Sequence, residues 1–418
     1  PSPSEPSDPL APLPPVQPAR GYALRGDPNF SVSDLDADQR LWYNRVWATI
    51  GNPSQYPNAT KLALTDDIYQ YRGDLQDYIT SVLMAFRVTG DLRLLDEVDR
   101  IAELMRSKLS DPWRDTLDGS NGTRDGFLNW SERYSRDAKY TGKDTHEAFD
   151  VKANTLVAMI AWALENNRDL TSPSGRDYGA QADFWKDYLV NHFEAKWRKR
   201  KGVASGFPFI DMTGFHTFHS WMRWHYYMGK LTGDSAYTRE AERMATVLWT
   251  REFKETPSDF GTALVWPRGV LSSKLTPSED LGYLMPQDYA RYVIIELIDL
   301  HFEGFSYYAD REKVRMLART VADFVIDDDS FSSFARDIGG GAARAGLRAS
   351  SSSSWSRMNQ GRYAISSWGF LAAWDESPER RILRASLAVY NAREANKDKP
   401  TQIFIPVGML MYEMLVAQ

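Results

Sequence analysis

The chain has no cysteine among its 418 residues. Disulfide bonds, thiolate metal sites and a cysteine nucleophile are therefore excluded. It also lacks an uninterrupted apolar run of about 18 residues, the length that a membrane-spanning helix needs. The net charge of −6 provides no overall positive field that would attract nucleic acid or a membrane surface. These absences predict a protein without a membrane span and without a nucleic-acid partner.

Several short motifs of cofactor and metal enzymes are also missing. The chain contains no phosphate-binding P-loop, no dinucleotide-binding GxGxxG after a strand, no HExxH zinc motif and no GxSxG nucleophile turn. Only six histidines are present, and no third metal ligand stands at a diagnostic spacing from the closest pair. We therefore expect neither a metal ion nor an organic cofactor.

Aromatic residues, in contrast, are abundant. They make up 13% of the chain and include 14 tryptophans and 21 tyrosines. Flat rings stack on sugar faces, but they also fill the interfaces between helices. The composition is therefore compatible with a protein that handles carbohydrate and equally with dense helical packing.

The N-terminal segment differs in composition from the rest. Its first residues, PSPSEPSDPLAPLPPVQPARG, are rich in proline and serine and contain no hydrophobic signal core. Such a composition is typical of a flexible tether. Tethers of this kind follow a removed signal peptide or lipid anchor, and the first residue is proline rather than methionine. We expect a tether over residues 1–30, a catalytic domain over residues 31–418, and export to the periplasm, the outer membrane or the exterior of a bacterium.

From about residue 34 onward the hydrophobic pattern is helical and repetitive. Residues 78–105 and 221–249 each read as two helices joined at a Thr-Gly-Asp turn. The glycine suits a helix C-terminus and the aspartate caps the next helix. Similar turns recur every 65–80 residues or so, roughly the spacing of a helical-hairpin repeat whose neighbours bury its faces. The pattern predicts an all-α fold, an (α/α) toroid of about five to seven hairpins, with inner helices starting near Asp67, His146, Thr217, Gln287 and Arg362.

Two long insertions interrupt this rhythm, over residues 111–145 and 327–361. Both are rich in arginine and contain tryptophan, and each directly precedes an expected inner helix. Loops of this length are usually functional or disordered. We expect them to wall a cleft at one end of the ring, with Trp130 as a candidate substrate-binding residue.

The stretch GFHTFHSWMRWHYY, residues 214–227, holds three of the six histidines. His216, His219 and Arg223 are spaced so that they share one helical face, whereas His225 lies on the opposite face. His225 is therefore expected to be a packing residue. His216 and His219 fall in the first turn of an inner helix, where they could act in a cleft or form a buried structural pair.

A pair of tyrosines marks the next expected inner helix. Tyr289 and Tyr292 are three residues apart, with Arg291 between them. A tyrosine beside an arginine in a polar cleft can have a lowered pKa and serve as an acid or a base. Packing of the ring with a hydrogen-bonded hydroxyl is the alternative.

Two further groups are candidates for lining the cleft. His146, Asp150 and Asn154 form a polar stripe at i, i+4 and i+8 on an otherwise apolar helix. Arg362 stands at the start of the fourth inner helix, where it could contact an anion. Capping and interhelical hydrogen bonds would also explain the stripe, and surface exposure would explain Arg362.

Histidine, tyrosine, asparagine and nearby arginines together suit β-elimination from a uronic acid polymer. One group hydrogen-bonds the sugar carboxylate and stabilises the negative charge that develops when C5 loses its proton. A histidine or tyrosine removes that proton, and a tyrosine protonates the leaving O4. This chemistry needs no cofactor.

The stretch FHSWMRW, which begins at Phe218, resembles the start of an inner helix in the toroid alginate and glucuronan lyases of polysaccharide lyase families 5 and 38. The resemblance implies a lyase in which His219 is the histidine, Tyr289 the tyrosine and Arg291 the arginine. Phe218 stands where that pattern has asparagine, so Asn154, His146 or His216 would neutralise the carboxylate. The implied protein is a monomer that cleaves alginate, polymannuronate or glucuronan. The predicted catalytic residues are His219, Tyr289, Asn154 and Arg291, and the predicted substrate-binding residues are His146, His216, Arg223, Tyr292, Arg362 and Trp130.

Three other functions remain open at the level of sequence. A glycoside hydrolase on the same ring would need two carboxylates across a cleft, and Asp67, Asp150, Asp211 and Asp288 lie near expected helix starts. A sugar epimerase would use paired histidines. A non-catalytic glycan-binding protein would share the aromatic residues and the tether but would need no acid–base pair.

Overall fold

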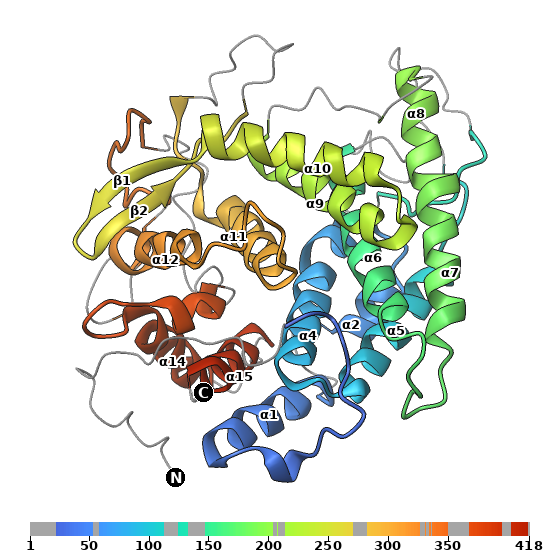
Figure 1. Ribbon diagram of the computed structural model, residues 1–418, viewed down its shortest axis with the longest axis horizontal. Coiled ribbons are helices and arrows are strands. Elements are labelled where there is room, and N and C mark those ends of the chain that lie inside the picture. Colours follow the sequence, from blue (N-terminus) through green and yellow to red (C-terminus); the bar gives the residue numbers. More distant parts are fainter. Residues whose placement is uncertain are drawn as a thin grey trace.

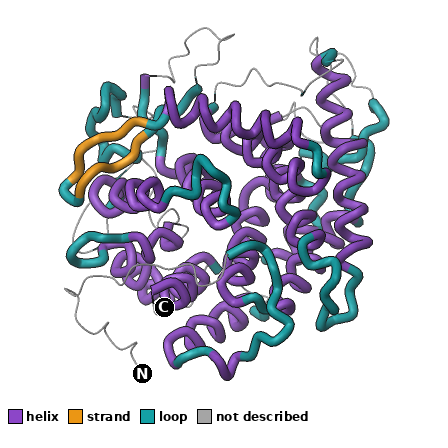
Figure 2. Tube along the Cα trace, in the orientation of Figure 1, coloured by secondary structure: helices purple, strands orange, loops and turns teal. Residues whose placement is uncertain are grey.

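The computed structural model describes most of the chain as helix (Figures 1 and 2). The all-α expectation is therefore confirmed. The described residues are 22–52, 58–112, 124–132, 147–203, 207, 214–270, 282–326, 331, 334–335, 337–349, 368–394 and 403–416.

The α-helices fall into long elements and short connecting ones. The long helices are α1 (Ala37–Ile50), α4 (Gln76–Thr89), α5 (Leu92–Arg106), α6 (Glu147–Glu165), α7 (Tyr178–Tyr188), α9 (Phe215–Thr232), α10 (Ser235–Val247), α11 (Gln287–Phe302), α14 (Arg381–Glu394) and α15 (Phe404–Val416). The shorter ones are α2 (Ala59–Ala63), α3 (Ile68–Gln70), α8 (Ala195–Lys201) and α12 (Arg311–Arg319). Turns of 3-10 helix cover Val32–Asp34 and Gly369–Trp374.

The helical hairpins turn where the sequence predicts. Gly90 ends α4 with a φ of 74°, and its N–H donates to the carbonyl of Phe86. Asp91 then caps α5 by accepting a hydrogen bond from the backbone N–H of Arg93. Gly233 and Asp234 repeat this arrangement between α9 and α10. A residue in the left-handed conformation followed by a capping carboxylate reverses the chain within two residues. Glycine suits the positive φ, and aspartate suits the N-cap of the next helix.

One set of helices is buried on nearly every side. Every residue of α4 is buried, and so are most residues of α6, α9 and α15. Helices α5, α10 and α12, which come directly after α4, α9 and α11 in the chain, bury only one face. A helix that is apolar all round belongs in a protein interior, whereas an amphipathic one covers it. The structure therefore has inner and outer helices.

The inner helices pack against one another in chain order. Helix α4 contacts α6, α6 packs on α9, and α9 packs on α11 (Figure 1). Helix α11 contacts the segment Gly369–Trp374, which packs on α15, and α15 packs against α4. The C-terminal helix thus contacts the first inner helix.

Turns of π-helix interrupt or extend several of these helices. Three of them, Leu189–Glu194, Leu248–Glu252 and Thr320–Val325, follow directly on α7, α10 and α12. A fourth, Tyr71–Leu75, precedes α4 and contains Gly73 with a non-helical φ of −110° and ψ of −106°. Turns of this kind often occur at functional sites, and the fourth one carries Arg72.

A small antiparallel sheet lies beside the start of α9. Strand β1 (Lys254–Ser258) pairs with β2 (Gly261–Val265), with Lys254 opposite Val265. The chain after β2 then runs past α9, where the N–H of Phe215 donates to the carbonyl of Arg268 over 2.9 Å. This backbone bond brings Arg268 to the first turn of α9.

No helix within the described residues combines the length and the apolar character needed to cross a membrane. Most residues of the two predicted insertions lie outside the described residues, and so do His146, Asp211 and Arg362.

Candidate functional site

The starts of α9 and α11 bring two predicted residues together. The rings of His216 and Tyr289 stack with their centres 4.6 Å apart and an angle of 24° between their planes. Both side chains are partly exposed, whereas most of their neighbours on these helices are buried. Gly214 precedes the helix, and a Cβ atom there would lie 3.3 Å from Cε1 of His216, so glycine leaves room for the imidazole ring.

Positive charges surround this stacked pair. The pKa of His216 lies well below its ordinary value, first because of burial and then because of the charges of Lys152, Arg72 and Arg268. Lys152 points at Tyr292, with Nζ 3.9 Å from the ring centre. Cation–π contact of this kind stabilises a charge that has left water. Because burial and positive neighbours both disfavour imidazolium, His216 is neutral at neutral pH.

Arg72 is held by two rings, with its guanidinium carbon 4.1 Å from the ring centre of Tyr69 and 4.2 Å from that of Phe149. Its place follows from the π-helical turn before α4, which contains Arg72 and the irregular Gly73. The four residues Arg72, Lys152, Arg268 and Arg291 are called the cationic cluster below.

Arg291 connects the cationic cluster to helix α4. Its guanidinium pairs with Asp77 of α4 at 2.6 Å and donates to the Tyr292 hydroxyl at 2.9 Å. Burial raises the pKa of Asp77 to about 6, although the charge of Arg291 opposes this rise. The predicted residues Tyr289, Arg291 and Tyr292 therefore lie in one site with His216.

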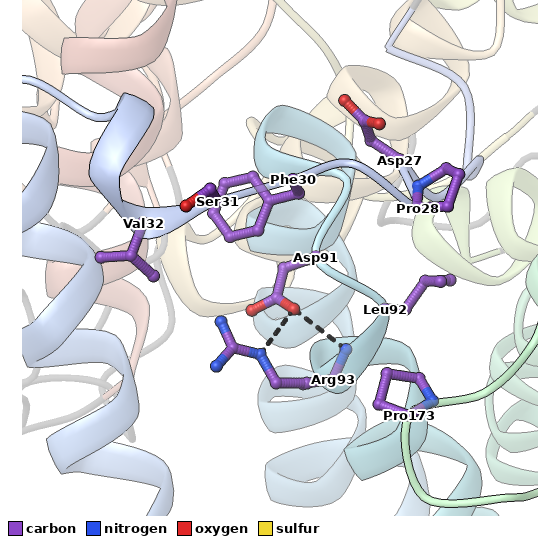
Figure 3. A pocket seen from close by; sticks show the side chains of 9 residues that line it. All are labelled: Asp27, Pro28, Phe30, Ser31, Val32, Asp91, Leu92, Arg93 and Pro173. Atoms are coloured by element: carbon purple, nitrogen blue, oxygen red, sulfur yellow. Dashed lines mark hydrogen bonds and ion pairs between the residues drawn. The ribbon is translucent and has the colours of Figure 1, made fainter.

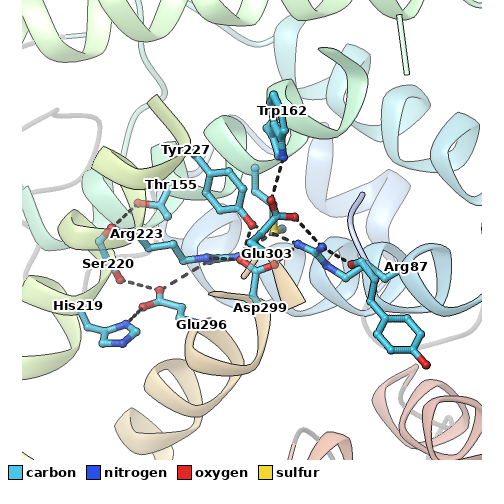
Figure 4. A network of polar contacts seen from close by, with 12 residues as sticks. Arg87, Thr155, Trp162, His219, Ser220, Arg223, Tyr227, Glu296, Asp299 and Glu303 are labelled. Atoms are coloured by element: carbon cyan, nitrogen blue, oxygen red, sulfur yellow. Dashed lines mark hydrogen bonds and ion pairs between the residues drawn. The ribbon is translucent and has the colours of Figure 1, made fainter. Parts of the chain in front are cut away.

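His219 lies one turn deeper and belongs to a different set of contacts. Its side chain is fully buried, with Nδ1 2.8 Å from Glu296 Oε2 (Figure 4). Its Nε2 lies 3.2 Å from the Tyr308 hydroxyl. Ser220 donates to the other Glu296 oxygen at 2.8 Å. The structure therefore places His219 in a sealed polar network and not against Tyr289.

Arg223 belongs to the same buried network. Its Nε donates to Asp299 Oδ2 at 2.7 Å, and Arg87 of α4 pairs with Asp299 and with Glu303 (Figure 4). Although burial opposes it, the two guanidinium groups hold the pKa of Asp299 below its ordinary value. Charges removed from water need such mutual pairing, so this network accounts for the position of Arg223 without a substrate.

Asp150 and Asn154, the described residues of the predicted polar stripe on α6, are buried, and Asp150 faces α8. Asn154 donates to the Asp150 carboxylate at 2.8 Å, and Asp150 pairs with the buried Lys196 of α8 at 2.7 Å. Lys152, two residues beyond Asp150, lies on another face and meets Tyr292 of α11. The predicted catalytic Asn154 is thus fully buried on the far side of its helix from the His216–Tyr289 pair.

Trp130 is buried as well. Its indole N–H donates to the carbonyl of Met105 at 2.9 Å, and its ring packs edge-on against Tyr71 with centres 5.0 Å apart. In the described structure it is a core residue. His225 is also a core residue, as expected, since its Nδ1 lies 2.8 Å from the carbonyl of Trp221.

Sequence reasoning missed three members of the cluster: Arg72, Lys152 and Arg268. One signal for Lys152 was present, because a single lysine interrupts the apolar run VKANTLVAMIAWAL. A charged residue in a helix interior is rarely fully buried unless it has partners. Arg72 and Arg268 lie in short irregular segments, where periodicity gives no indication of side-chain direction.

A separate cavity of about 370 Å³ lies at the opposite end of α4, beside the Gly90–Asp91 turn (Figure 3). The charged groups Asp91 and Arg93 in its wall are already paired with each other, because Asp91 accepts hydrogen bonds from Arg93 and from the Tyr43 hydroxyl. The cavity is lined by Asp27, Pro28, Phe30, Ser31, Val32, Asp91, Leu92, Arg93 and Pro173.

Comparison with models of known protein families and with curated proteins finds no match to this chain.

Proposed function

We propose that this protein is a polysaccharide lyase that cleaves a uronic acid polymer, alginate, polymannuronate or glucuronan, by β-elimination. The observation that supports this most is the cationic cluster around the His216–Tyr289 pair. A neutral imidazole beside a phenol, surrounded by lysine and arginine, suits a substrate whose reacting sugar carries a carboxylate. Export of the protein is part of the proposal.

The proposal includes an (α/α) toroid as the architecture. Supporting it, each inner helix packs on the next, and α15 packs on α4. Asp77 and Arg291, near the starts of α4 and α11, form one ion pair, while Arg87 and Asp299, further along the same helices, form another. Two pairings in this order require α4 and α11 to run in the same direction, as inner helices of such a ring do.

In the proposed reaction, Arg72, Arg268 and Lys152 attract the uronate carboxylate and stabilise the charge that develops on it. His216 takes the C5 proton, the C5–H electron pair forms the C4–C5 double bond, and the C4–O4 bond breaks. Tyr289 gives a proton to the departing O4. The atoms balance, and the products are an unsaturated uronate end and a new hydroxyl end.

This proposal assigns the role of catalytic histidine to His216 instead of His219. Both ring nitrogens of His219 lie within hydrogen-bond distance of Glu296 or Tyr308, and its side chain has no exposed surface. Proton transfer from a sugar requires contact with the base. His216 is partly exposed and stacks on the tyrosine that the proposal needs.

The test is to incubate the purified protein separately with mannuronan, guluronan and glucuronan. The ultraviolet absorbance of the unsaturated uronate is followed over time. A lyase raises the absorbance on at least one polymer. New reducing ends without absorbance would instead indicate a hydrolase, and binding without either would indicate a glycan-binding protein.

A further inference from the structure

Three short segments beside the proposed site pair edge to edge through their backbones. The N–H of Arg268 donates to the carbonyl of Tyr283 over 2.9 Å. The N–H of Leu284 donates to the carbonyl of Arg348, also over 2.9 Å. The pairing of Pro267 with Leu284 is antiparallel, and that of Tyr283 with Arg348 is parallel. Residues that lie opposite each other in extended segments point to the same face, so Arg268, Tyr283 and Arg348 form one row, called the outer row below.

The outer row faces away from the core. Arg348 is exposed, and Arg268 and Tyr283 are partly exposed. Leu284 and Leu347, which are their neighbours along the chain, are buried. Successive side chains of an extended segment point to opposite faces, and the alternation of burial agrees with this. Two arginines with a tyrosine between them therefore lie on an accessible surface.

One end of the outer row adjoins the proposed catalytic pair. The N–H of Phe215, the first residue of α9, donates to the carbonyl of Arg268. From Tyr283 the chain runs directly into α11, which contains Tyr289. Neighbouring extended segments lie about 4.8 Å apart. Arg348, two segments along from Arg268, is therefore roughly 10 Å further out along the row.

The guanidinium of Arg348 is held in place by packing. Its central carbon lies 4.1 Å from the ring centre of Tyr283. A Cβ atom on Gly282 would lie 3.1 Å from Nη2 of Arg348, so glycine leaves room for the group. Within the described part of the chain, this guanidinium makes no hydrogen bond and no ion pair. An arginine stacked on a ring keeps its N–H donors for a planar acceptor, and their fork matches a carboxylate.

A uronic acid polymer has a charge pattern that fits this row. Each sugar has one carboxylate, so a chain with its reacting sugar at His216 presents further carboxylates to either side. Arg348 lies where such a carboxylate could reach it, on the surface that leads away from the catalytic pair. The protein as a whole is acidic, with a net charge of −6, so a local positive patch is needed to attract a polyanion.

We propose that Arg348, supported by Tyr283 and Gly282, binds the carboxylate of a uronate sugar that lies beyond the reacting one. Arg348 takes no part in proton transfer. It makes the binding site longer than the catalytic pair requires, so that long chains bind more tightly than short ones. The inference rests on the proposed function, since it takes a uronic acid polymer as the ligand.

The test measures binding separately from turnover. Isothermal titration calorimetry is carried out on Tyr289→Phe, the parent variant, which the proposed mechanism makes inactive. The ligands are disaccharides and hexasaccharides of glucuronan, mannuronan and guluronan, with cellohexaose as a neutral control. Adding Arg348→Met should weaken binding of the preferred hexasaccharide about 10-fold, because a charged hydrogen bond is lost. Binding of the disaccharide should not change, and cellohexaose should show no dependence on Arg348.

Further variants separate recognition by Arg348 from effects on folding. Tyr283→Leu removes the ring under the guanidinium and should weaken hexasaccharide binding, whereas Tyr283→Phe keeps the ring and should bind like the parent. Arg106→Met is the matched control. Arg106 is also an exposed arginine over an aromatic ring, that of Phe184, but it lies on the outer helix α5. Its loss should leave hexasaccharide binding unchanged.

Three results would overturn the inference. The first is equal hexasaccharide affinity with and without Arg348, the second is an equal loss for the disaccharide, and the third is no binding of any hexasaccharide. Failure of the proposed function has a different signature. The wild type would then form no unsaturated product from any polymer, while Arg348→Met still weakened binding of the hexasaccharide and not of the disaccharide.

Discussion

His216 and Tyr289 stack on each other at the starts of two helices that are far apart in the sequence. If they form the acid–base pair of a lyase, His216→Gln and Tyr289→Phe should each lower kcat about 10²–10⁴-fold, the range of a lost general acid or base. The assay is product absorbance on whichever uronate polymer the wild type cleaves. His225→Phe is the control, because His225 packs in the core. Full activity in either variant would remove that residue from the proposed mechanism.

The cationic cluster should determine affinity for the anionic substrate. Arg72→Met should raise KM about 10- to 100-fold, since a charged hydrogen bond contributes about 1.5–3 kcal/mol. Arg106→Met is a close match, because Arg106 also lies over an aromatic ring, Phe184 at 3.6 Å, but on an outer helix. Initial rates over a range of polymer concentrations measure the effect. An equal change in KM for both variants would show that Arg72 has no specific role.

The buried network between α4, α9 and α11 should contribute to stability. Arg87→Met leaves Glu303 without its guanidinium partner and Asp299 with Arg223 alone, and breaking a buried pair costs about 3–5 kcal/mol. Urea unfolding measures the loss. In Arg25→Met, which removes an exposed pair with Asp169, the urea midpoint should stay close to that of the wild type, because solvent screens an exposed pair. A similar small loss in Arg87→Met would mean that the network is not stabilising.

His225 should make the protein sensitive to acid. Burial lowers the pKa of His225 to about 4, so between pH 6.5 and 4 the unfolded chain binds a proton that the folded chain does not. Stability from this residue is therefore present above pH 6.5 and is lost as the pH falls toward 4. Between pH 7 and 4.5 the loss is about 2 kcal/mol.

The measurement is urea unfolding of the wild type and His225→Phe at both pH values. Phenylalanine is the replacement because it keeps a ring among the aromatic neighbours of His225, which are Phe207, Trp221, Trp224 and Tyr237. The wild type should lose about 2 kcal/mol more than the variant on acidification. Equal losses would show that His225 binds a proton in the folded protein as readily as in the unfolded chain.

The sequence by itself determined the local structure well. The Thr-Gly-Asp turns contain a glycine with positive φ and a capping aspartate, and both requirements are local to a few residues. Helical periodicity also placed His216, His219 and Arg223 on one face correctly, since all three contact α11. Rotation around one helix is a property of spacing alone.

Only the tertiary structure decided how deep each of these residues lies and which partner it meets. His216 and His219 are one turn apart, yet the first is partly exposed beside cations and the second is sealed against Glu296. On α6, Asp150 of the predicted polar stripe faces α8, whereas Lys152 faces Tyr292 of the site. Periodicity separates the faces of a helix but contains no information about the neighbour that each face will meet, because those neighbours come from segments far away in the chain.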